Sequence, residues 1–127
     1  IMIEKKIVIE KVTEFATTQI DKISKGSNMI TLLRPFITRA VNIKIGQLDS
    51  ILSVVTDKDG MVDIEGMLNE FVDNLLVTQV QKHPSTFGET EIGEGQIKWT
   101  VPGLGKQIVI DTSDIEELKQ LITNPKN

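Results

Sequence analysis

The spacing of apolar residues changes along this chain, and that change constrains the fold more than any other feature. Up to about residue 81, apolar residues recur every three to four positions, as in amphipathic helices. Over residues 96–111 the apolar side chains instead alternate with polar ones on both sides of a glycine-rich connection. This second pattern predicts a β-hairpin. A chain that carries both patterns is expected to have an α+β fold.

Three helices are predicted before the hairpin and a short one after it, at about 4–25, 29–55, 64–81 and 114–122. Proline has no amide hydrogen, so Pro35 predicts a kink or a new helix start near Arg34. The expected architecture is a three-helix N-terminal bundle, then the β-hairpin of residues 96–111, then a short C-terminal helix. The chain length fits a single domain over 1–127. A mainly α fold with a small β-arm is the alternative.

The second helical region has an unusually broad apolar stripe. Its members are Phe36, Ile37, Ala40, Val41, Ile43, Ile45, Leu48, Ile51, Leu52, Val54 and Val55. A stripe of this width favours a central helix with neighbours on more than one side. The alternative is that part of the stripe forms a surface for self-association.

Charge and composition exclude several classes of function. The net charge of −4 and the pI of about 5.0 give no general attraction to nucleic acid or to anionic membranes. No apolar run approaches the roughly 18 residues of a membrane-spanning helix. Cysteine is absent, which excludes disulfides and thiolate metal ligands and is compatible with a cytoplasmic protein.

One stretch, VVTDKDGMVDIEGMLNEF at residues 54–71, has the outline of a metal-binding motif. The candidate metal ligands in it are Asp57, Asp59, Asp63 and Glu65. With a helix on each side, "DKDG" followed by "VDI" resembles the calcium loop of an EF-hand shortened by deletion. The resemblance implies that these four carboxylates hold a calcium ion, with backbone carbonyls near Met61 supplying further ligands.

The EF-hand pattern is nevertheless incomplete. With Gly60 at the glycine position of the loop, Asp57 and Asp59 fall on ligand positions, but the first and last ligand positions hold Val55 and Gly66. The bidentate glutamate that closes the coordination shell is therefore missing. The simpler interpretation is that Asp59-Gly60 forms a turn and that Asp63 caps the next helix. We favour that interpretation.

The residues available for catalysis are few. The chain has one histidine, no cysteine and no tyrosine, and it contains no phosphate-binding motif. Glu89, Glu91 and Glu94 lie in a polar segment, residues 85–95, that is expected to be a loop with solvated carboxylates. A hydrolase built on this loop is the least favoured alternative.

The sequence therefore predicts no enzyme and no cofactor. It predicts a small structural or protein-interaction protein that associates with a protein partner or with itself. Such a homo-oligomer or assembly subunit would be of bacterial or phage type. A calcium-binding module with a degenerate EF-hand-like loop at 57–65 is the alternative.

Overall fold

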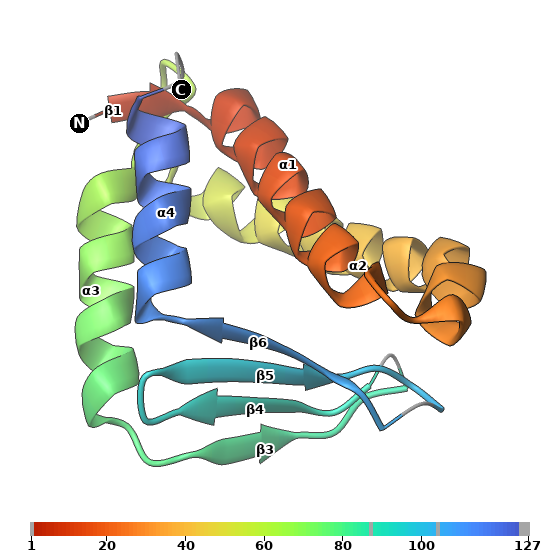
Figure 1. Ribbon diagram of the computed structural model, residues 1–127. Helices are drawn as coiled ribbons and strands as arrows, with labels where there is room; N and C mark the ends of the chain where they lie inside the picture. The colour runs from red at the N-terminus through yellow and green to blue at the C-terminus, as the bar shows by residue number, and fades with distance from the viewer. Residues whose placement is uncertain (1, 87, 104, 125–127) are drawn as a thin grey trace.

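The computed structural model describes residues 2–86, 88–103 and 105–124. Within these residues the chain forms four helices and two antiparallel sheets (Figure 1). The helices are α1 (Lys5–Ser24), α2 (Asn28–Val55), α3 (Ile64–Val77) and α4 (Thr112–Thr123). The strands are β1 (Met2–Glu4), β2 (Met61–Asp63), β3 (Gln81–His83), β4 (Thr90–Gly93), β5 (Gln96–Thr100) and β6 (Gln107–Asp111).

These elements form three groups around a common interior (Figure 1). The helices α1 and α2 form an antiparallel hairpin, α3 and α4 lie side by side, and β3–β4–β5–β6 form a four-stranded sheet. The small sheet β1–β2, with Ile3 opposite Val62, joins the start of α1 to the start of α3. The mixed helix-and-sheet class is confirmed. The predicted three-helix bundle is not confirmed: α3 lies beside α4 as well as sharing a core cluster with α1 and α2, and a four-stranded sheet stands where a hairpin alone was predicted.

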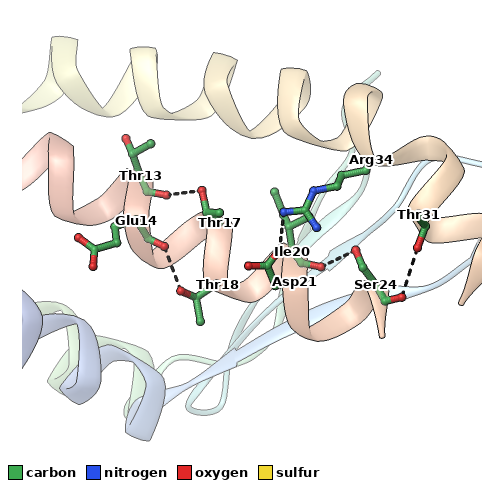
Figure 2. Close-up of polar contacts among 9 residues, drawn as sticks. All are labelled: Thr13, Glu14, Thr17, Thr18, Ile20, Asp21, Ser24, Thr31 and Arg34. Carbon is green, nitrogen blue, oxygen red and sulfur yellow. Dashed lines mark hydrogen bonds and ion pairs between the residues drawn. The ribbon is translucent and has the colours of Figure 1, made fainter. Parts of the chain in front are cut away.

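The α1–α2 hairpin is held by apolar packing and by polar contacts near its turn. The turn ends at Ser27, whose hydroxyl caps α2 by accepting a hydrogen bond from the Ile30 amide at 3.2 Å. Figure 2 shows the Asp21–Arg34 ion pair, which joins the two helices close to the turn. Buried Ile20 lies in the same core cluster as Ile30 from α2. These contacts fix the register of the hairpin.

The exposed side of α1 carries threonines as well as charged residues. The hydroxyl groups of Thr13, Thr17 and Thr18 each donate to a backbone carbonyl one turn earlier, at 2.8–3.2 Å. Figure 2 shows the bonds of Thr17 and Thr18. Such bonds satisfy the hydroxyls within the helix itself. This face of α1 is therefore polar without offering groups that need a partner.

The third helix is shorter than expected. It ends at Val77 rather than near residue 81, because the β4–β5 turn supplies donors to its last carbonyls. The amide of Glu94 donates to the Thr78 carbonyl at 2.8 Å, and that of Gly95 donates to the Leu75 carbonyl at 2.9 Å. The residues after this end, Gln81–His83, pair with β4 as strand β3.

The predicted hairpin is present as β5 and β6, with Trp99 opposite Ile108, but it belongs to a larger sheet. Residues 90–93, which were expected to be loop, form β4 and pair with β5. Leu104, in the connection between β5 and β6, lies outside the described residues. Trp99 is partly buried and packs against the cluster around Ile20, which agrees with a core role.

The last helix starts at Thr112, two residues before the expected position, because Asp111 caps it. The Asp111 carboxylate accepts from the Asp114 amide at 3.1 Å, and the Asp114 carboxylate accepts from the Asp111 amide at 3.0 Å. This reciprocal pair is a capping box. Hydrogen bonds from the Ser113 hydroxyl and the Asp114 amide lower the pKa of the Asp111 carboxyl from its ordinary value.

The second helix runs unbroken through Pro35 for 28 residues, so no new helix starts near Arg34. It buries one face only, so the expected central position between several neighbours is wrong. Among the described helices, none combines the length and the apolar character needed to span a bilayer.

Candidate functional site

The loop between α2 and α3 is organised by Asp57. Its Oδ1 atom accepts hydrogen bonds from the amides of Asp59 and Met61, both at 2.9 Å. The Asp57 amide also donates to the Met61 carbonyl at 2.9 Å, and Gly60 has a positive φ of 78°. This is an aspartate-stabilised turn in which glycine takes the left-handed position. The Asp57 carboxylate thus closes the loop on itself.

The other predicted calcium ligands are placed separately. Asp63 caps α3 by accepting a hydrogen bond from the Gly66 amide at 3.2 Å, as the sequence indicated. Glu65 lies in the first turn of α3. Within residues 2–86, 88–103 and 105–124, no three acidic or histidine side chains come close enough together to hold a metal ion. Calcium binding by Asp57, Asp59, Asp63 and Glu65 remains a prediction to be tested.

Positive charge also lies next to this loop. A polar hollow of about 420 Å³ is lined by Asp57 and Asp59 together with Lys5 and Lys6. The Lys5 ammonium forms an ion pair with Asp49 at 3.0 Å and donates to the Ser53 hydroxyl at 2.9 Å. Two lysines at the same hollow oppose the binding of a cation there.

The acidic segment that follows β3 faces a lysine rather than a pocket. Lys82 lies 4.0 Å from the Glu89 carboxylate and 3.9 Å from that of Glu91. Glu91 is also opposite Lys98 on the neighbouring strand. Neither Glu89, Glu91 nor Glu94 lines either of the two hollows described here. The arrangement is that of a solvated sheet face with paired charges.

An apolar hollow, partly open to solvent, lies where the three groups of elements meet. It is a cavity of about 430 Å³, and we call it the central cavity. All four helices and strands β4, β5 and β6 contribute side chains to it. Its lining residues are Val12, Phe15, Ala16, Gln19, Ile20, Ala40, Val41, Lys44, Ile45, Leu48, Leu68, Phe71, Thr90, Ile97, Trp99, Ile108, Ile110, Ile115 and Leu118.

The central cavity divides the core in two. One cluster of buried residues contains Val8 and Leu52, and the other contains Ile20 and Ile37. On α1 and on α2, the residues between these pairs line the cavity. The two ends of the helical hairpin are therefore packed, whereas its middle borders an open interior.

Only Gln19, Lys44 and Thr90 are polar in this lining, and no carboxylate is present. Gln19 is 7% exposed, and its Nε2 atom has no hydrogen-bond partner among the described residues. A buried amide without a partner costs on the order of 1–3 kcal/mol. Lys44 is exposed, so it lies at the rim, and it forms no ion pair with the described part of the chain.

Neither Gln19 nor Lys44 was predicted from the sequence as a site residue. A signal was present, since Gln19 follows Val12 and Phe15 at the spacing of the apolar face of α1. A polar residue in that register is unusual enough to mark either a buried hydrogen bond or a ligand contact. Lys44 gave no signal, because an exposed lysine on a helix is ordinary.

A second candidate surface lies on the outside of α2. We call it the outer α2 face, and it is defined by Met29, Leu32, Phe36, Ile43, Gln47, Ser50, Ile51, Val54 and Val55. Phe36 is 71% exposed and Val54 is 84% exposed. Apart from the half-buried Ile43 in the middle of the helix, the apolar members form two groups, one toward each end of the helix. None of the nine residues is charged.

Comparison with known proteins gives no relative: no family model, no curated protein and no solved structure matches the chain. Any function must therefore be argued from the residues and their arrangement.

Proposed function

We propose that the protein is a small non-enzymatic interaction protein that assembles with a second copy of itself through the outer α2 face. The observation that carries this proposal is the exposure of large apolar side chains along that face, among them Leu32 at 72% and Phe36 at 71%. Several large apolar side chains exposed on one helix of a small domain are typical of an interaction surface. Their burial is favourable by about 25 cal/mol per Å², and the entropy lost on association offsets part of this gain.

The pattern of the face fits an identical partner. With 28 residues, α2 is about 42 Å long, and the apolar groups lie at its two ends. In an antiparallel pair of α2 helices, Met29 and Leu32 of one copy would meet Ile51 and Val54 of the other. A twofold interface brings the same patch of both copies together, and this patch is self-complementary in that arrangement.

Sedimentation equilibrium over a range of protein concentrations tests the proposal. We expect the wild type to approach twice the 14.1 kDa of one chain and Val54→Glu to remain at the mass of one chain. Val54 lies in one of the two apolar groups of this face, and a charged side chain is costly to bury there.

Val77→Glu is the matched control for this experiment. Val77 is 82% exposed and also ends a helix, but it lies on α3, outside the outer α2 face. The control should associate like the wild type. A wild type that remains monomeric at high concentration would contradict the proposal, and so would equal effects of the two substitutions.

A further inference from the structure

We infer that the central cavity binds a small amphiphile, an unbranched aliphatic chain that carries one anionic head group such as a carboxylate. The site is separate from the outer α2 face and does not depend on self-association. The inference is based on the volume of the cavity, the composition of its lining and the two polar groups there that have no partner.

The apolar part of the ligand follows from the lining. A volume of about 430 Å³ falls in the range of small-molecule sites, roughly 300–1,000 Å³. Filled with water, it would hold on the order of ten molecules at about 30 Å³ each. Those molecules would face sixteen apolar side chains and only three polar ones. Water is poorly satisfied in such surroundings, so an aliphatic chain is the better occupant.

The head group follows from the polar side chains. The Gln19 Nε2 atom is a buried donor without an acceptor, and the Lys44 ammonium at the rim has no ion-pair partner in the described residues. Both groups offer hydrogens, and no lining residue offers a carboxylate. A ligand carboxylate at the rim would accept a charge-assisted hydrogen bond from the Lys44 ammonium, and rotation of the Gln19 amide toward the cavity would add a second donor. A cationic head would meet Lys44 with no counter-charge.

The chain contains its own reporter of occupancy. Trp99 is the only tryptophan, and it lines the central cavity. Decanoate should therefore change the tryptophan emission in a saturable way, with one molecule bound per chain by calorimetry. Two ligands with the same chain length act as probes of the head group, 1-decanol and decyltrimethylammonium. We expect 1-decanol to bind about tenfold more weakly than decanoate and the cation to show no saturable binding.

Substitutions connect the binding to the two polar groups. Lys44→Met should remove the preference for decanoate over 1-decanol, and Gln19→Leu should weaken the binding of both. Lys22→Met is the matched control, because Lys22 is exposed on α1 and does not line the cavity. Val54→Glu should bind decanoate like the wild type, which separates this site from the proposed interface.

Saturable binding of decanoate that responds to Lys44→Met but not to Lys22→Met supports the inference. It is overturned if decanoate produces no saturable change in emission or heat. Equal binding of decanoate and decyltrimethylammonium overturns it as well. A loss of binding in Val54→Glu alone would place the ligand on the outer α2 face and would likewise overturn it.

Discussion

At the scale of single residues, Asp57 decides how the loop between α2 and α3 is interpreted. In an EF-hand the corresponding carboxylate coordinates calcium. Here the Asp57 Oδ1 atom accepts hydrogen bonds from two backbone amides. A carboxylate that stabilises a turn contributes to folding whether or not calcium is present. The two roles can therefore be separated by changing the metal and the residue independently.

We predict that Asp57→Ala lowers the free energy of unfolding on the order of 1 kcal/mol, because two amides lose their acceptor. The loss should be the same in millimolar calcium and in chelator. Thermal or urea unfolding under both conditions measures it. The wild-type curves in calcium and in chelator should also coincide.

Asp59→Ala is the control, since the Asp59 side chain accepts no hydrogen bond from the described residues. It should leave the unfolding curve unchanged under both conditions. If both substitutions destabilised the protein only in calcium, the loop would be a metal site and the turn interpretation would fail.

At the scale of elements, α2 combines an unfavourable residue with an unbroken helix. Pro35 cannot donate to the carbonyl of Thr31, and a proline inside a helix costs up to about 3 kcal/mol relative to alanine. The sequence predicted a kink or a new helix start at this point. The helix continues because Ile30 and Ile37, on either side of the proline, are both buried in the same cluster. Tertiary packing offsets the local preference.

We predict that Pro35→Ala raises the free energy of unfolding by about 1–3 kcal/mol, because the missing hydrogen bond can then form. Pro35 is exposed, so the change removes little packing. Urea unfolding of the two proteins measures the difference.

Gly46→Ala is a useful comparison, since nothing lies within 4 Å of a methyl group at that position. It should add about 1 kcal/mol by helix propensity alone. A loss of stability in Pro35→Ala would mean that the proline fits a bend that α2 requires.

The end of α3 illustrates a different limit of sequence reasoning. Apolar periodicity continued to Val80, so the helix was expected to end near His83-Pro84. The helix stops at Val77 because Glu94 and Gly95, distant in sequence, donate to its last carbonyls. No local signal carries that information.

At the scale of the whole molecule, the central cavity exists because the side chains of the three groups of elements meet without filling the space between them. Ala16 lines the cavity in the middle of α1, between the two core clusters. A small residue at this position leaves room that a larger one can occupy. A larger apolar side chain at Ala16 can therefore fill part of the cavity.

We predict that Ala16→Leu raises the free energy of unfolding by about 2 kcal/mol, because leucine buries three more carbons than alanine at roughly 0.8 kcal/mol each. It should also prevent decanoate from binding. Thr17→Leu is the control, because Thr17 is exposed and does not line the cavity. This substitution should change the free energy of unfolding of the protein by less than about 0.5 kcal/mol. Destabilisation by Ala16→Leu would show that the interior cannot accept the added volume.

The sequence by itself determined the elements whose signals are local. Apolar periodicity located α1, α2 and most of α3, and the change of period located the β5–β6 hairpin. Asp63 was identified as a helix cap because capping depends on residues three positions apart. These features follow from interactions between near neighbours in the chain.

Only the tertiary structure decided how the elements meet. It joined β3 and β4 to the hairpin, placed α3 beside α4, and left one face of α2 exposed. It also brought Gln19 and Lys44 from separate helices to one cavity. Contacts of this kind join residues far apart in the chain, and many pairings are compatible with the same local pattern. The choice among them depends on the packing of the whole core.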